Sequence, residues 1–281
     1  MSSTQILVLG AVAGFTIFFG LPVGRLRRQA IGLKAFLGAT ATGILLFLLW
    51  DVLAAGIEPV ESALNAAALE HSGTWLRFSG LATIFVLFLV AGLMSLVYYD
   101  RLLSGHRRKR FLSVGAASAV EFEVGAAGLS PAESLSLLIA TGIGLHNFSE
   151  GLAIGQSAAQ GELSLAYVLV IGFGLHNATE GFGIVGPLSG GKDRPSWGFL
   201  GLLGLIGGGP TLLGTLLGQS WVSEPVSIAF LALAAGSILY VVIELLHVCR
   251  GFGRKTSLAW GLLLGLLLGF GTDFVLVAAG A

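Results

Sequence analysis

Eight apolar runs, each long enough to cross a lipid bilayer, occupy most of the 281-residue sequence. A helix needs about 20 apolar residues to span the hydrocarbon layer of a membrane. Hydrophobic residues make up 55% of the chain and charged residues only 11%, which is more apolar surface than one soluble core can bury. We therefore expect one transmembrane domain, residues 1–281, of the all-α polytopic class. Its eight helices are predicted at about residues 4–22, 33–56, 77–99, 133–157, 163–186, 197–219, 225–248 and 257–279.

The basic residues predict the orientation of these helices. Fourteen of the fifteen Lys and Arg fall on the side of the membrane that the chain reaches after its first helix, and Arg77 is the exception. Because cytoplasmic loops are enriched in Lys and Arg, both termini are predicted to be extracytoplasmic, and residues 100–132 to form a cytoplasmic loop. The basic run 106–110 in that loop is interpreted as a topology signal or a contact with anionic lipid headgroups. No role in nucleic-acid binding is expected.

One polar motif occurs twice inside this apolar sequence. Residues 142–155 and 172–185 share eight of fourteen positions. An ionisable group in the middle of a spanning helix costs roughly 2.5 to 3.5 kcal/mol on insertion scales, so it indicates function by default. The polar residues of the two copies are His146, Asn147 and Glu150, and His176, Asn177 and Glu180.

The spacing within each copy places its His, Asn and Glu on one stripe of a helix. The two helices are joined by a short connection, so we expect antiparallel neighbours with both motifs near the middle of the bilayer. Two imidazoles, two carboxylates and two amide oxygens then converge, and such donors bind Zn²⁺ or a related ion such as Fe²⁺, Mn²⁺, Co²⁺ or Cd²⁺. The alternative is that these side chains only hydrogen-bond across the helix interface.

The doubled His-Asn-x-x-Glu-Gly motif, the eight spans, the outside termini and the cytoplasmic third loop together resemble the ZIP (Zrt/Irt-like) family of divalent-metal transporters. The resemblance implies uptake of Zn²⁺ or a related ion toward the cytoplasm by alternating access. It also implies a 3+2+3 arrangement of helices with an inverted repeat, and a homodimer. The metal is then a transported substrate, and neither a catalytic cofactor nor an enzymatic activity is expected. By the same resemblance, the primary site consists of His146, Glu150, His176 and Glu180, and a second site of Asn147, Asn177 and the two glutamates.

The sequence departs from the family pattern in two places. Relatives commonly have Pro two residues after the motif Asn, whereas this chain has Ser149 and Thr179; a hydroxyl can bond back to the i−4 carbonyl and bend a helix more gently. Relatives also often have a glutamate before a proline on the sixth helix, where this chain reads Gly207-Gly208-Gly209-Pro210. With one carboxylate fewer, the site is predicted to hold mainly one ion.

Four more polar residues lie near predicted helix ends. Asp51 and Asp273 are near the outer ends of the second and eighth helices. They are interpreted either as residues at the level of the lipid headgroups or as an electronegative entrance for cations. Glu244 and His247 are near the inner end of the seventh helix. They are interpreted either as an exit relay for the ion or as an interfacial pair that reaches toward water. The compact loops favour a prokaryotic inner membrane.

Two alternative functions would explain some of the motif residues but not all of the sequence. A membrane-embedded metal hydrolase would use a glutamate as general base on a metal-bound water, but it needs a further His or Asp ligand set that the sequence does not provide. A nonmetal, proton-coupled carrier would use the glutamates alone and leaves both histidines and both asparagines unexplained. Metal flux without turnover of lipid separates the metal transporter from both.

Overall fold

A computed structural model describes residues 2–26, 31–69, 72–113, 129–159, 163–190, 194–220 and 223–278. Within these ranges the chain is helical and contains no β-strand. By length and composition, seven helical segments in the described ranges can cross a membrane, which confirms an all-α membrane protein at that level. The α-helices are α1 (Ser3–Phe15), α2 (Ile31–Ala68), α3 (Trp75–Ser113), α4 (Pro131–Ala159), α5 (Leu163–Val185), α6 (Trp197–Gly218), α7 (Glu224–Gly251) and α8 (Lys255–Ala278).

Two helices continue well beyond the apolar runs that predicted them. α2 extends to Ala68 rather than to about residue 56, and α3 to Ser113 rather than to about residue 99. The added segments are polar but rich in Glu, Ala, Leu, Arg and Lys, which are good helix formers. Hydropathy marks where a helix leaves the apolar layer, not where it ends. The predicted loop 100–132 is therefore helical at its start, while its middle, 114–128, lies outside the described residues.

The first helix is shorter than predicted. The α-helix ends at Phe15 and is followed by two short 3₁₀ helices, η1 (Thr16–Phe19) and η2 (Leu21–Arg25). The Thr16 hydroxyl donates to the Ala13 carbonyl at 2.7 Å, and Pro22 near the start of η2 cannot donate a backbone hydrogen bond. The α-helical hydrogen-bond pattern therefore ends in the middle of the apolar run. A third 3₁₀ helix, η5 (Pro187–Gly190), follows α5.

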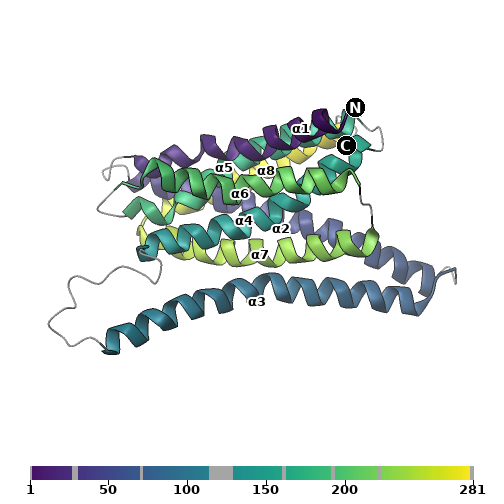
Figure 1. The fold of residues 1–281 in the computed structure, drawn as a ribbon, viewed down its shortest axis with the longest axis horizontal. Helices are drawn as coiled ribbons and strands as arrows, with labels where there is room; N and C mark the ends of the chain where they lie inside the picture. The colour runs from purple at the N-terminus through teal and green to yellow at the C-terminus, as the bar shows by residue number, and fades with distance from the viewer. Residues whose placement is uncertain are drawn as a thin grey trace.

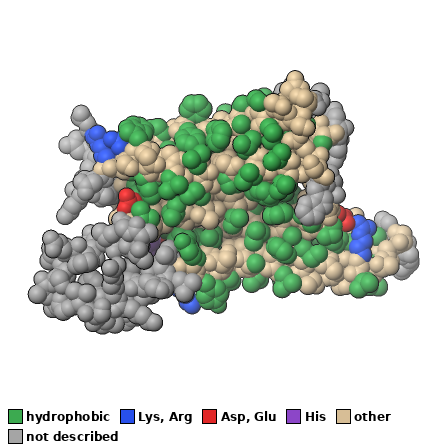
Figure 2. All heavy atoms as spheres, viewed as in Figure 1, with side chains coloured by type: hydrophobic (Ala, Val, Ile, Leu, Met, Phe, Trp, Pro, Cys, Tyr) green, Lys and Arg blue, Asp and Glu red, His purple; other side chains and the backbone are tan. Residues whose placement is uncertain are grey.

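The helices form two groups that run side by side (Figure 1). One group contains α1, α4, α5 and α6, with α4 packed mainly on α6; the other contains α2, α3, α7 and α8, with α2 packed mainly on α8 and α3 on α7. Contacts of α7 with α4 and of α2 with α5 join the groups. Figure 2 shows hydrophobic side chains over the middle of the molecule and charged side chains toward its two ends, the pattern of a membrane-spanning bundle.

Four helix crossings have the same geometry, with one glycine against another. In each pair, a Cβ added to either glycine would collide with the carbonyl oxygen of the residue three before its partner. Small residues let membrane helices approach this closely, and a larger side chain has no room because the opposing atoms are backbone. The pairs are Gly151 with Gly214 and, one turn on, Gly155 with Gly218 (α4–α6), Gly181 with Gly20 (α5–η1), Gly43 with Gly265 (α2–α8) and Gly92 with Gly236 (α3–α7).

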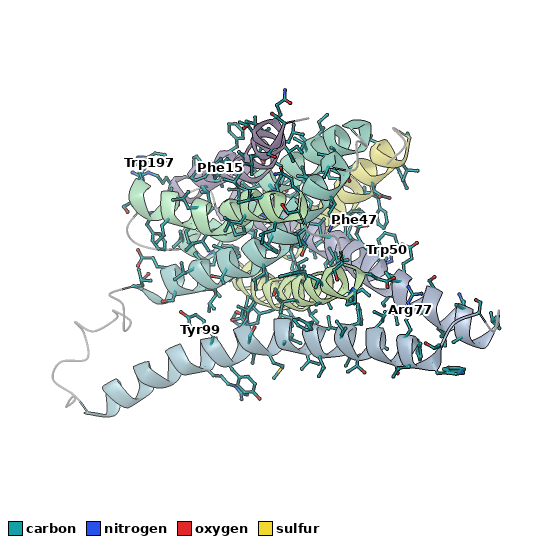
Figure 3. All side chains as sticks on the ribbon, turned by 45° about the vertical axis from the view of Figure 1, so that its right-hand side comes forward. Phe15, Phe47, Trp50, Arg77, Tyr99 and Trp197 are labelled. Atoms are coloured by element: carbon teal, nitrogen blue, oxygen red, sulfur yellow. The ribbon has the colours of Figure 1, made fainter. Side chains whose placement is uncertain are left out.

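Two arginines connect helix ends at opposite ends of the bundle. Arg77 of α3 forms an exposed ion pair with Glu224 of α7, with both carboxylate oxygens near its Nη2 at 2.9 and 3.0 Å. Arg25 of η2 donates to the Pro195 carbonyl and lies 4.6 Å from the centre of the Trp197 ring. The labelled Arg77 and Trp197 lie far apart along the bundle in Figure 3. Arg77, the exception in the charge pattern, thus has a carboxylate partner at its own end of the molecule.

Candidate metal centre

The two polar motifs lie in the middle of α4 and α5, and each is followed directly by a glycine that fixes its helix. Gly151, after Glu150, makes the close crossing with α6, and Gly181, after Glu180, makes the equivalent crossing with η1. The sequence repeat is therefore also a repeat in packing. Each motif helix is held against a different neighbour at the position of its glutamate.

On α4, the three motif side chains are buried. His146 Nε2 lies 3.0 Å from Glu150 Oε1, one helical turn away. The Asn147 amide nitrogen donates to Glu180 Oε2 at 3.2 Å and to the Gly207 carbonyl at 3.0 Å. Asn147 thus joins α4 to both α5 and α6, and the structure brings it directly to a motif carboxylate of the other helix.

On α5, the second motif is arranged differently from the prediction. Asn177 and Glu180 are buried, but the Asn177 amide nitrogen donates to the Ala13 carbonyl of α1 at 3.1 Å. The side chain of His176 lies outside the part of the chain that the structure describes. The prediction of six side chains around one point involved α4 and α5 alone, whereas backbone groups of α1 and α6 also take part.

The two asparagines have equivalent surroundings. Each donates its amide nitrogen to the carbonyl of a residue that precedes a glycine, and these glycines, Gly14 and Gly208, lie against each other's carbonyl oxygens. A carbonyl can only accept a hydrogen bond, so it fixes which end of the amide faces it. The amide oxygen of each asparagine must therefore point elsewhere.

The amide oxygens of the two asparagines indicate what the site can bind. Asn147 Oδ1 and Asn177 Oδ1 are buried, and neither has a hydrogen-bond partner among the described residues. Leaving a buried acceptor unpaired costs about 1 to 3 kcal/mol. A bound cation removes that cost, because amide and carboxylate oxygens are good ligands for divalent ions.

The His and Glu side chains alone do not form a compact cluster. Among the side chains that the structure describes, no three His, Cys, Asp or Glu are close enough together to hold a metal ion. His146 lies against Glu150 on its own helix, and the imidazole of His176 is not described. The predicted set His146, Glu150, His176 and Glu180 is thus not assembled as one group in this part of the structure.

The two departures from the family pattern have clear structural counterparts. Ser149 Oγ is buried and has no hydrogen-bond partner in the described ranges, so this hydroxyl does not bond to a carbonyl of its own helix, and α4 runs unbroken. Pro210 lies inside α6. A Cβ added to Gly209 would meet no atom within 4 Å. The position before this proline therefore carries no carboxylate, although a side chain would fit there.

The remaining predicted path residues fall into two pairs. Gly265 lies against Gly43, and Gly269 against Phe47 (labelled in Figure 3), four residues further along both helices. One more turn brings Asp273 level with Asp51, and both are half-buried. On α7, Glu244 is half-buried but His247 is exposed. His247 therefore lies on a different face of α7 from buried Leu245 and Cys249.

Three groups near the motifs were not predicted: the carbonyls of Ala13 and Gly207, and the hydroxyl of Thr211. Backbone carbonyls have no side-chain signature, although both of these precede a glycine at a helix crossing. Thr211 Oγ1 is fully buried and, within the described structure, has no hydrogen-bond partner. The proline directly before it was the available signal in the sequence.

No model of a known protein family matches this chain, and no curated protein matches it. The function is therefore inferred from the residues and their geometry.

Proposed function

We propose that this chain transports a divalent transition-metal ion toward the cytoplasm, as the ZIP-like motifs imply, with Zn²⁺ as the expected ion and Fe²⁺, Mn²⁺ and Cd²⁺ as further candidates. The observation that carries the proposal is the pair of buried amide oxygens, Asn147 Oδ1 and Asn177 Oδ1, that lack a hydrogen-bond partner in the described structure. The ion would bind near the middle of the membrane, between α4 and α5. Its ligands would come from His146, Asn147, Glu150, His176, Asn177 and Glu180.

The amide geometry favours a cation site over simple adhesion between helices. A polar side chain that only joins helices gains most when all its polar atoms are paired. Both asparagines instead use the nitrogen, and the oxygen is unpaired within the described ranges. Two buried glutamates, Glu150 and Glu180, match the charge of one divalent ion, and buried charges in proteins are typically paired or coordinate a metal.

The packing supports an inverted repeat as part of the proposal. The contact of α3 with α7 has a counterpart in the contact of α8 with α2. The contact of α4 with α6 likewise has a counterpart in the contact of α5 with α1 and η1. Both pairs of contacts use the same glycine crossing. This pattern fits eight spanning helices in a 3+2+3 arrangement with both termini outside the cytoplasm. A homodimer in a prokaryotic inner membrane completes the proposal.

Uptake by purified protein in liposomes tests the function. Vesicles that contain a fluorescent indicator should report entry of Zn²⁺, and the variants Glu150→Gln and Glu180→Gln should lose it, because each removes a charge and keeps the shape. Glu133→Gln is the matched control: it lies near the start of the same helix, where its carboxylate accepts a hydrogen bond from the Ser130 amide. Uptake near the wild-type rate in both motif variants would refute the site. A wild-type protein that moves none of several divalent ions would refute the function.

A further inference from the structure

Several buried hydroxyls in the described helices bond to the carbonyl four residues before them, whereas those of Ser136, Ser149 and Thr211 have no hydrogen-bond partner there. Thr42 donates to Gly38, Thr215 to Thr211, and Ser237 to Leu233, at 2.8 to 2.9 Å. Thr211 is as buried as these residues, yet its hydroxyl has no hydrogen-bond partner in the part of the chain that the structure describes. An unpaired buried hydroxyl is costly, so the absence of this bond at Thr211 needs a reason.

The reason lies in the contact of α6 with the first motif. The carbonyl four residues before Thr211 is that of Gly207, and it accepts the amide nitrogen of Asn147 instead. The Thr211 side chain packs against α1, where its Cβ and Oγ1 lie 2.8 and 2.9 Å from the position of a Cβ on Gly14. The usual acceptor for a hydroxyl at this position is therefore already bonded to Asn147.

Thr211 contacts the backbone next to both motifs. Gly14 follows Ala13, whose carbonyl accepts from Asn177. On its other side, the Thr211 carbonyl lies against Gly151, the residue after Glu150. The hydroxyl thus lies where α1, α4 and α6 meet, beside the residues that hold the two asparagines and one glutamate in place.

We propose that Thr211 is a specificity-determining residue, whose hydroxyl oxygen contributes a neutral ligand to the transported ion from α6. This inference rests on the proposed transport function and adds a residue to it. Together with Asn147 Oδ1 and Asn177 Oδ1, the hydroxyl gives the site three uncharged oxygens. Since position 209 carries no side chain, α6 offers a hydroxyl rather than a carboxylate.

The chemistry predicts which ions depend on Thr211. Zn²⁺ is satisfied by four nitrogen and oxygen ligands, fewer than the six side chains of the two motifs. Mn²⁺ prefers six oxygen ligands, so it benefits more from an added neutral oxygen. The hydroxyl should therefore widen the range of ions that the site accepts, rather than raise Zn²⁺ affinity.

The test compares the apparent KM of Mn²⁺ and Zn²⁺ uptake in proteoliposomes. For Thr211→Val, which keeps the shape and removes the hydroxyl, the KM for Mn²⁺ should rise about tenfold, the lower range for loss of a supporting contact at a metal site. The KM for Zn²⁺ should change much less, because four-coordinate Zn²⁺ does not need the added oxygen. Thr211→Ser should restore the wild-type ratio. Thr215→Val is the matched control, because Thr215 is equally buried on the same helix but its hydroxyl is already bonded.

A melting measurement in detergent gives a second readout. Without metal, Thr211→Val should melt at or above the wild-type temperature, because replacing an unpaired buried hydroxyl by a methyl group is neutral or stabilising. Its stabilisation by added Mn²⁺ should be smaller than that of the wild type. Thr215→Val should melt below the wild type without metal and keep the full Mn²⁺ effect.

The outcomes separate this inference from the function on which it rests. If the wild type transports metal but Thr211→Val keeps the wild-type ratio of the two KM values, or Thr215→Val changes it equally, the role of Thr211 is refuted and the transport function stands. If the wild type transports neither ion, both are refuted. A changed ratio in Thr211→Val alone, restored by serine, supports the inference.

Discussion

Replacing Gly151 by Ala is the most informative test of the packing that holds the first motif. A Cβ at this position would collide with the carbonyl oxygen and carbon of Thr211 and with the amide nitrogen of Thr215. All three atoms are backbone, so no side-chain rotation relieves the overlap. α4 and α6 must move apart, at the level of Glu150.

The magnitude follows from a comparison with Gly209. Gly209→Ala places a methyl group where no atom lies within 4 Å, so it should only gain the helix preference of Ala over Gly, about 1 kcal/mol. Gly151→Ala gains the same preference but adds overpacking, which costs typically 1 to 3 kcal/mol. Because the preference is common to both variants, their difference reports the overpacking. We expect this difference near its upper end, about 3 kcal/mol, since the opposing atoms are backbone.

The assay is thermal unfolding of both variants in the same detergent, followed by tryptophan fluorescence. For a protein of this size, about 1 kcal/mol corresponds to roughly 2 to 4 °C in Tm. Gly151→Ala should therefore melt about 6 to 12 °C below Gly209→Ala. Equal melting temperatures would show that α4 and α6 do not cross as closely as described, and would remove the packing equivalence of the two motifs.

Two further predictions concern charge. A double-mutant cycle with Arg77→Gln and Glu224→Gln measures the coupling of the two side chains in the free energy of unfolding. Because the pair is exposed, this coupling should be below about 1 kcal/mol and should decrease with salt. A coupling above about 2 kcal/mol that salt does not affect would contradict this estimate. Asn147→Asp should destabilise the metal-free protein by about 3 kcal/mol or more, because an uncompensated carboxylate would face the Gly207 carbonyl and Glu180. Added Zn²⁺ should raise the Tm of this variant more than it raises the Tm of the wild type. An unchanged Tm of the metal-free variant would contradict the assigned amide orientation.

The sequence predicted the helices better than their ends. Hydropathy locates the segments that are apolar enough to cross a membrane. It does not predict the 3₁₀ turns after Phe15 or the polar extension of α3 to Ser113. The repeated motif includes Gly151 and Gly181, but it does not show that they make equivalent crossings. That equivalence depends on tertiary contacts between distant segments.

The candidate site was predictable in its residue types but not in its partners. The repeat identified Asn147 and Asn177, and their amides indeed lie buried in the bundle. Their acceptors are the carbonyls of Gly207 and Ala13, which every residue type possesses and which no sequence pattern marks. Thr211 was missed for the same reason, since its hydroxyl matters only through what Asn147 does to the neighbouring carbonyl.

The ion pair between Arg77 and Glu224 has a consequence for how the protein is made. The two residues are separated by 147 positions in the chain. At synthesis rates of about 5 to 20 residues per second, the ribosome needs roughly 7 to 30 s to reach the glutamate after it has made the arginine. Any folding step that α3 completes within this time takes place while Arg77 lacks this carboxylate partner. The ion pair can therefore stabilise the finished bundle, but it can form only after α7 has begun to be made.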